Sequence, residues 1–174
     1  CIDADAGHFV SSSGSTGQSH CHLGTYQPDP GQSSCMNATA GHYVGTNGSA
    51  SQTPCDLGTW QNQTGQASCM NATTGHYVDT NGSASQTPCS PGTWQNQTGQ
   101  ASCMNATAGH YVDTNGSASQ TPCAAGTYNP WPGQYWPGCM NATAGHYVDS
   151  NGSASQTPCS LGTYNPSNGS NSSA

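Results

Sequence analysis

Aromatic and β-branched residues recur along this chain in very short clusters, and polar turn residues separate one cluster from the next. Gly-His-Tyr-Val at 41–44 and Gly-Thr-Trp at 58–60 are two of them, and Asn-Gly or Pro-Gly turn signals lie around such clusters. Short β-branched and aromatic runs bounded by these turns are typical of β-hairpins. Gly, Pro, Ser, Thr and Asn recur too often to leave a helical apolar stripe. The pattern therefore predicts short β-hairpins with little or no helix.

The cysteines mark a repeat of 34 residues. They stand at alternating intervals of 20 and 14 residues, with one interval of 16. Their positions are Cys1, Cys21, Cys35, Cys55, Cys69, Cys89, Cys103, Cys123, Cys139 and Cys159. Each interval is predicted to form a short strand, a turn and a second short strand.

Five repeats follow from this spacing. Their predicted bounds are 1–34, 35–68, 69–102, 103–138, which holds a two-residue insertion, and 139–174, which ends in a Ser/Asn-rich tail. Units of a repeat array pack mainly against their neighbours. We therefore expect small disulfide-rich repeats whose β-hairpins stack into an elongated rod.

Apolar residues are too few for an ordinary hydrophobic core. Leu, Ile, Val and Phe together supply ten of the 174 residues, whereas ordering each residue's backbone costs about 1–2 kcal/mol. Cross-links must supply part of the stability, and the ten cysteines are suited to that role. Disulfides persist in oxidising compartments, so an extracellular or cell-surface location is expected. No apolar run is long enough to span a bilayer, so we expect any anchoring segment to lie outside these residues.

Two disulfide pairings fit the spacing. Pairing across the longer interval joins Cys1 with Cys21 and Cys35 with Cys55, continues in the same way, and leaves no cysteine free. We favour this pairing because the 20-residue interval is constant, whereas the insertion changes the shorter interval. Pairing across the shorter interval, as in Cys21 with Cys35, leaves Cys1 and Cys159 unpaired. Those two cysteines could then link one subunit covalently to the next.

The charged residues argue against several classes of partner. The chain has seven acidic residues, all of them Asp, and neither Lys nor Arg. Contacts with phosphate groups depend on Lys and Arg, so neither nucleic acids nor anionic membrane surfaces are expected as partners. Direct membrane insertion is not expected either.

The strongest chemical signal is the Asn-x-Ser/Thr sequon for N-linked glycosylation. Of fourteen asparagines, only Asn129 and Asn165 lie outside a sequon, and proline follows both of them. The second and third repeats each carry three sequons in three different contexts, so copying of one accidental sequon does not explain the pattern. Ser and Thr side chains are further candidates for O-linked sugar. The predicted N-glycosylation sites are Asn37, Asn47, Asn62, Asn71, Asn81, Asn96, Asn105, Asn115, Asn141, Asn151, Asn168 and Asn171.

Two parts of the chain differ from the rest. The first repeat has no sequon, and the insertion at 131–136 gathers two tryptophans and a tyrosine in one loop. Bare or apolar surface of this kind is typical of contacts between proteins. The candidate subunit contacts are Ile2, Phe9, Trp131, Tyr135 and Trp136.

Other chemistries have weaker support. Every repeat contains one Gly-His-aromatic segment, and copying of one packing position explains the recurring histidine without a metal. The run from Asp79 to Ser83 resembles the start of a calcium loop, yet the chain has no Glu for the distal bidentate ligand. Ser, His and Asp recur in each repeat and form no unique cluster. No metal, no cofactor other than covalent glycans, and no catalytic site is predicted.

Two segments resemble known extracellular modules. The run from Cys55 through Gly58-Thr59-Trp60 to Cys69, and Gly-His-Tyr-Val at 41–44, resemble the cysteine-rich repeats of ephrin-receptor-like and tumour-necrosis-factor-receptor-like ectodomains. They are also similar to repeats of protist and microbial surface antigens. The resemblance spans nearly the whole chain and implies elongated, disulfide-laddered extracellular rods used as stalks, coats or binding ectodomains. The chain departs from the receptor modules because it lacks their Cys-x-x-Cys step.

These features predict a structural, heavily N-glycosylated extracellular protein that assembles end to end into a filament, appendage or surface coat. Its expected partners are copies of itself. An alternative is a stalk or adhesin segment of a larger surface protein, which presents a binding domain located elsewhere.

Overall fold

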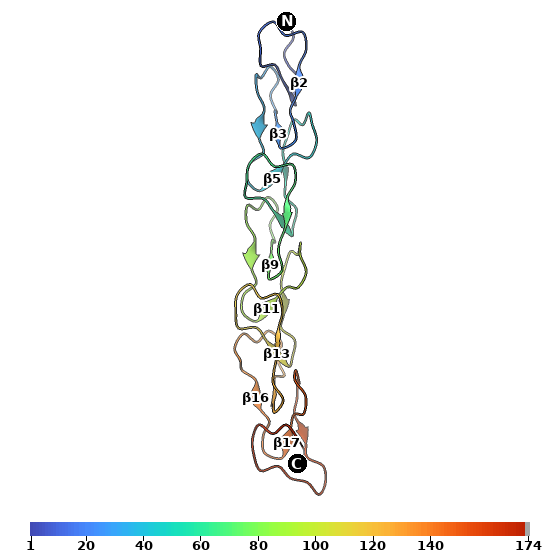
Figure 1. The fold of residues 1–174 in the computed structure, drawn as a ribbon, viewed down its shortest axis with the longest axis vertical. Coiled ribbons are helices and arrows are strands. Elements are labelled where there is room, and N and C mark those ends of the chain that lie inside the picture. Colours follow the sequence, from blue (N-terminus) through green and yellow to red (C-terminus); the bar gives the residue numbers. More distant parts are fainter. Residues whose placement is uncertain (173–174) are drawn as a thin grey trace. The chain divides into compact units, whose positions relative to one another are not determined.

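The computed structural model describes residues 1–172, and these residues form an all-β structure without a helix. Eighteen strands of two residues pair into nine antiparallel hairpins over this range (Figure 1). The predicted short hairpins are confirmed. Ser173 and Ala174, which end the predicted fifth repeat, lie outside the described residues.

Two kinds of hairpin alternate along the chain. The first kind begins at a Gly-His pair, and we call its members the His hairpins. They are β1 (His8–Phe9) with β2 (Ser19–His20), β5 (His42–Tyr43) with β6 (Thr53–Pro54), β9 (His76–Tyr77) with β10 (Thr87–Pro88), β13 (His110–Tyr111) with β14 (Thr121–Pro122), and β17 (His146–Tyr147) with β18 (Thr157–Pro158).

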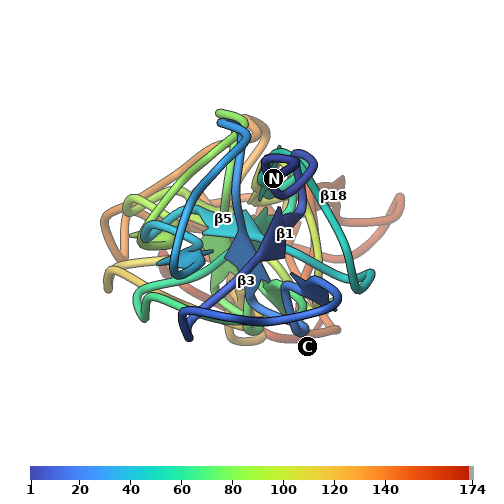
Figure 2. The same cartoon turned by 90° about the horizontal axis from the view of Figure 1, so that it is seen from above.

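The second kind begins at a Gly-Thr pair, and we call its members the Thr hairpins. They are β3 (Thr25–Tyr26) with β4 (Met36–Asn37), β7 (Thr59–Trp60) with β8 (Met70–Asn71), β11 (Thr93–Trp94) with β12 (Met104–Asn105), and β15 (Thr127–Tyr128) with β16 (Met140–Asn141). Seen from above, β1, β3 and β5 overlap in projection near the centre of the view, and loops project outward (Figure 2).

The chain divides into two compact units. One contains Cys1–Thr73, Val78–Thr87 and Gly99–Ala101, and the other contains Thr74–Tyr77, Pro88–Thr98 and the residues from Ser102 onward. The same hydrogen-bond pattern between successive hairpins occurs within each unit.

Three backbone hydrogen bonds join each hairpin to the next. Between β1–β2 and β3–β4, the Gly7 N–H donates to Gln27 O at 2.7 Å, the Val10 N–H to Gln32 O at 3.1 Å, and the Gly31 N–H to Ala4 O at 2.8 Å. The equivalent three bonds then join β3–β4 to β5–β6, although the side chains differ. The backbone therefore repeats every half of the 34-residue sequence period.

Glycine is required where alternate hairpins approach each other. Gly41 has φ +82°, and a Cβ built on it would overlap with the carbonyl oxygen of Gly82. Both residues recur in nearly every repeat, so this backbone contact explains two of the glycines that punctuate the sequence.

The core consists of small side chains. At one position Ala and Cys alternate from hairpin to hairpin, and beside it lie the valines of the His hairpins. The buried apolar residues are Ala4, Cys21, Ala38, Val44, Cys55, Ala72, Val78, Cys89, Ala106, Val112, Cys123, Ala142 and Val148. This narrow core is consistent with the low apolar content of the chain.

The disulfides contradict the pairing that we favoured. Pairs across the longer interval, such as Cys35 with Cys55, do not form, and Cys1 and Cys159 are unpaired in the described residues. The insertion lies in the loop between β15 and β16, and Cys123 and Cys139 pair as the cysteines of the other Thr hairpins do. The constant 20-residue interval therefore carried no information about pairing. The observed disulfides are Cys21–Cys35, Cys55–Cys69, Cys89–Cys103 and Cys123–Cys139.

Each disulfide joins the residue four positions before the first strand of a Thr hairpin to the residue immediately before its second strand. The two Cα atoms are 5.7–5.8 Å apart, a separation that suits an unstrained bridge. At the same place in the His hairpin β5–β6, the Thr39 N–H donates to Gln52 Oε1 at 2.7 Å, and Gln52 Nε2 donates to Thr39 Oγ1 at 3.0 Å. We call this pair of hydrogen bonds the glutamine clasp. Covalent and hydrogen-bonded closures thus alternate along the chain.

Candidate functional site

All twelve sequon asparagines are exposed at the surface. They occupy a small number of repeated places on the hairpins. The second strands of the Thr hairpins carry Asn37, Asn71, Asn105 and Asn141, the loops of the His hairpins carry Asn47, Asn81, Asn115 and Asn151, the loops of two Thr hairpins carry Asn62 and Asn96, and the last segment carries Asn168 and Asn171. Every predicted N-glycosylation site is therefore accessible to an attached glycan.

The two asparagines outside sequons lie deeper in the structure. Asn129 is 1% exposed; its Nδ2 donates to His110 O at 3.0 Å, and its Oδ1 accepts the Trp131 N–H at 3.2 Å. Asn165 is half-buried and makes the same two kinds of bond. Both replace the buried glutamines of other Thr hairpins, which are Gln27, Gln61 and Gln95.

The amide nitrogens of the sequon asparagines remain available. N-linked sugar is attached to the side-chain amide nitrogen, and within residues 1–172 no sequon asparagine uses that nitrogen as a hydrogen-bond donor. Asn151 and Asn168 are bonded through the other atom, since each Oδ1 accepts a backbone N–H, from Ala125 at 2.8 Å and from Ala144 at 3.0 Å. These bonds orient the side chains and leave Nδ2 free.

The first repeat has neither kind of common site. Asp3 stands where the later repeats have the asparagine of Asn-Ala-Thr, and Ser13 stands where they have the asparagine of Asn-Gly-Ser. The surface around β1 and β2 therefore holds no sequon.

The candidate contact residues are exposed to different extents. Ile2 is 99% exposed, and Trp131, Tyr135 and Trp136 are 55%, 63% and 67% exposed. Phe9 lies in β1 and is half-buried. The three aromatic residues all lie in the loop between β15 and β16.

The residues considered for metal binding make local contacts. His42 Nδ1 lies 3.3 Å from Ala40 O, and in the Asp79 turn Ser83 Oγ donates to Thr80 O at 2.6 Å. No cluster of His, Cys, Asp or Glu that could hold a metal occurs among residues 1–172. In the same range no helix is long and apolar enough to cross a membrane.

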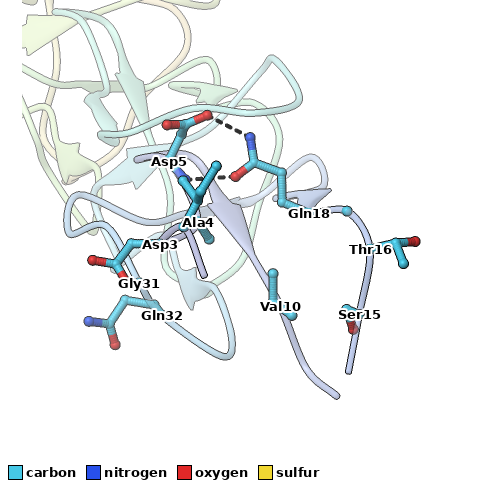
Figure 3. Close-up of a pocket in the computed structure, with 11 residues that line it drawn as sticks. Asp3, Ala4, Asp5, Val10, Ser15, Thr16, Gln18, Gly31 and Gln32 are labelled. Atoms are coloured by element: carbon cyan, nitrogen blue, oxygen red, sulfur yellow. Dashed lines mark hydrogen bonds between the residues drawn. The ribbon is translucent and has the colours of Figure 1, made fainter. Parts of the chain in front are cut away.

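A cavity of about 480 Å³ lies at the first His hairpin, and the sequence pattern did not reveal it. Its walls come from the segment at Ile2–Asp3, from Val10 and Ser15 on the two sides of the β1–β2 loop, and from Gln32 (Figure 3). Next to it the Asp5 N–H donates to Gln18 Oε1 at 2.7 Å, the first glutamine clasp. The one sequence signal for this cavity was the valine, because Val10 aligns with valines that are buried in the later repeats.

Comparison with known proteins adds no relative. Neither a protein-family model nor a curated protein matches the chain. What the structure establishes is an array of small β-hairpin repeats with disulfides. Four disulfides among residues 1–172 suit an oxidising environment.

Proposed function

We propose that this chain is a structural glycoprotein of the extracellular space or cell surface, which assembles with copies of itself into a filament, appendage or surface coat. The observation that carries the proposal is the division of the asparagines: all twelve in sequons are exposed, and the two outside sequons are buried or half-buried in hydrogen bonds. Selection for N-linked sugar would produce this coincidence of sequon and accessibility.

A dense coat of glycans has a physical role in such a structure. Hairpins with two-residue strands and a core of Ala, Cys and Val leave much of the backbone close to solvent. Glycans solubilise the surface and keep strand edges from pairing with other chains. The sugar therefore protects a fold that has little core, and assembly takes place through surface that carries no sequon, at β1–β2 or at the Trp131–Trp136 loop.

Electron microscopy of the natively glycosylated protein tests this proposal. We expect fibres or a continuous coat at high protein concentration, and we expect enzymatic removal of N-glycans to cause lateral aggregation. A protein that stays monomeric at high concentration, with no ordered assembly in the images, would contradict the proposal and favour a stalk that presents a separate binding domain.

A further inference from the structure

Cys1 and Cys159 occupy two different cysteine positions of the repeat. Cys1 stands one 34-residue period before Cys35, which is the second cysteine of a disulfide pair. Cys159 stands one repeat after Cys123, which is the first cysteine of a pair. Both are unpaired in the part of the chain that the structure describes. The chain therefore has one unpaired cysteine that matches the first member of a disulfide pair, Cys159, and one that matches the second member, Cys1.

The first His hairpin leaves unused the backbone groups that later hairpins offer to the hairpin before them. These groups are the carbonyls of Val10 and Ser15 and the N–H of Gly14, and none has a backbone partner within residues 1–172. The cavity of Figure 3 lies at the same place. Val10 is half-exposed, whereas the valines at the same position of later hairpins are 2–3% exposed: Val44, Val78, Val112 and Val148.

The last segment leaves the complementary groups unused. The N–H groups of Gly162 and Asn165 and the carbonyl of Cys159 have no backbone partner among the described residues. Thr163–Tyr164 aligns with the first strand of every Thr hairpin but forms no strand. Large side chains of this segment are exposed, since Leu161 is 104% and Tyr164 78% exposed. Within the described residues, this segment corresponds to the first half of a Thr hairpin and has no second strand.

We propose that the first repeat of a second copy of this chain completes the last hairpin of the first copy, and that a disulfide between Cys159 and Cys1 of that second copy closes the joint. The proposal rests on the proposed function, for which it supplies the joint between subunits. The occupant is a second copy because the joint continues an interface that already recurs between successive hairpins of this chain.

Three hydrogen bonds would form in the established register. Between β15–β16 and β17–β18, the Gly126 N–H donates to Val148 O at 2.7 Å and the Gly152 N–H donates to Cys123 O at 2.8 Å, with Asn129 to Ser153 as the third bond. The same positions at the joint pair Gly162 with Val10, Gly14 with Cys159, and Asn165 with Ser15. Each unused donor thus meets an unused acceptor.

The missing strand of the last hairpin is supplied by Ile2–Asp3. In the preceding Thr hairpin, Thr127 pairs with Asn141 and Tyr128 with Met140. By the same register Thr163 pairs with Asp3, and Tyr164 pairs with Ile2. The pairing covers Ile2 and Tyr164, which are 99% and 78% exposed in the single chain. Because Asp replaces the usual sequon asparagine, this joining strand carries no glycan.

The covalent step is an oxidation of two thiols. The Sγ atoms of Cys159 and of Cys1 in the second copy form one S–S bond, and each thiol loses its proton. The two electrons pass to a small-molecule disulfide such as oxidised glutathione, whose own S–S bond breaks to give two thiols. The reaction proceeds by thiolate attack and a mixed disulfide, and it needs no other reactant.

A pair of complementary cysteine variants tests the joint in the full-length glycosylated protein. In buffer with oxidised glutathione, the unchanged protein is expected to give a ladder of covalent oligomers on a non-reducing gel. Cys1→Ser alone and Cys159→Ser alone are each expected to stay monomeric. An equimolar mixture of the two is expected to give a dimer and nothing larger, since it offers one Cys159 and one Cys1.

Mass spectrometry after a non-tryptic digest then identifies the linkage. A peptide pair that contains Cys1 and Cys159 supports the joint. Dimers of Cys1→Ser alone would overturn it, because they would show unspecific pairing of Cys159 with itself. Fibres whose digest lacks the Cys1–Cys159 pair would overturn the joint and leave the proposed function standing, whereas a native protein without assemblies would contradict the proposed function itself.

Glycine variants test the same register without the thiols. Gly109 and Gly152 are in close contact in the chain, and their counterparts at the joint are Gly145 and Gly14 of the second copy. Gly145→Ala has open space in the single chain, but its Cβ would overlap with the second copy's backbone, so ladder and fibres should be lost. Gly14→Ala is the matched control, because its φ of +76° is as strained and its counterpart Gly152 has side chains rather than backbone nearby, the nearest being the His110 ring at 3.1 Å. Equal assembly by both variants would overturn the register.

Discussion

Asn129 donates its side-chain amide to the His110 carbonyl in the place where three other Thr hairpins bury a glutamine. The glutamine of the first Thr hairpin, Gln27, donates to Ser34 O at 2.8 Å and accepts the Asp29 N–H at 3.1 Å. A buried amide with both of its groups bonded fixes the loop that follows it. Asparagines in this chain therefore have one of two roles. Buried asparagines fix the conformation of a loop, and exposed asparagines are the candidate sites for glycans.

Substitution of Asn129 separates these roles experimentally. Asn129→Leu leaves the His110 carbonyl and the Trp131 N–H without their partner, so the free energy of unfolding should fall by about 1–3 kcal/mol. Asn129→Gln should lose less, because glutamine fills this place elsewhere. Asn62→Gln, at an exposed site, is the control and should leave the stability of the unglycosylated protein unchanged. Denaturant unfolding measures all three, and equal stability of Asn129→Leu and the unchanged protein would contradict the role of the amide.

Gly41→Ala tests the close backbone contact between alternate hairpins. The left-handed φ of +82° alone costs about 1–3 kcal/mol for a residue with a Cβ, and overlap with the Gly82 carbonyl adds to it. Gly14→Ala has a φ of +76° with nothing within 4 Å, so it isolates the backbone strain. Thermal unfolding of the monomers should show Gly41→Ala to be the less stable variant. The same melting temperature for both would show that the hairpins can shift apart freely.

At the scale of the hairpin, the glutamine clasp and the disulfide are equivalent closures. Ala38 and Gln52 occupy the positions of the hairpin β5–β6 that Cys21 and Cys35 occupy in β3–β4. Ala38→Cys combined with Gln52→Cys should therefore form a fifth disulfide, which adds up to about 3 kcal/mol of stability. Thiol titration of the denatured protein should find no additional free thiol. Two additional thiols would mean that the hairpins are not equivalent, and Ala38→Cys alone, with one more thiol, is the control.

Removal of a disulfide should destabilise the protein more than removal of a glutamine clasp. Cys89→Ala with Cys103→Ala opens a 14-residue loop and should lower the free energy of unfolding by about 3 kcal/mol. Gln120→Ala removes only the hydrogen bonds to Thr107 and should lower it by about 1 kcal/mol. Urea unfolding distinguishes the two, and a larger loss for Gln120→Ala would contradict this ranking.

The hairpins could be predicted from the sequence, whereas the closures could not. Clusters such as Thr59–Trp60 and the turns around them are local signals, so the first strands lie at the expected clusters, whereas second strands such as Met70–Asn71 were not located from the sequence. The pairing of Cys21 depends on a half-period that the side chains conceal, because Val44 and Gln61 occupy the same backbone position without any shared chemistry. Glycines such as Gly41 and Gly58 repeat at this shorter period, as do the aromatic residues two positions after them, such as Tyr43 and Trp60, and this spacing was the signal for it.

In the molecule as a whole, the interactions that stabilise the fold and the residues that carry the sequons are different. Disulfides, clasps and hydrogen bonds between hairpins hold the described residues together, and the core of Ala, Cys and Val adds little apolar burial. The outward loops and strand ends carry the sequons. Since every repeat except the first carries sequons, the account predicts a sugar coat that is interrupted only at the first repeat and at the joint it forms.

Glycopeptide mass spectrometry of the native protein tests the central claim most directly. The chain has neither Lys nor Arg, so the digest needs a protease other than trypsin. The account predicts N-linked glycan at the twelve exposed sequon asparagines and unmodified side chains at Asn129 and Asn165. Native protein whose exposed sequon asparagines are mostly bare would contradict it.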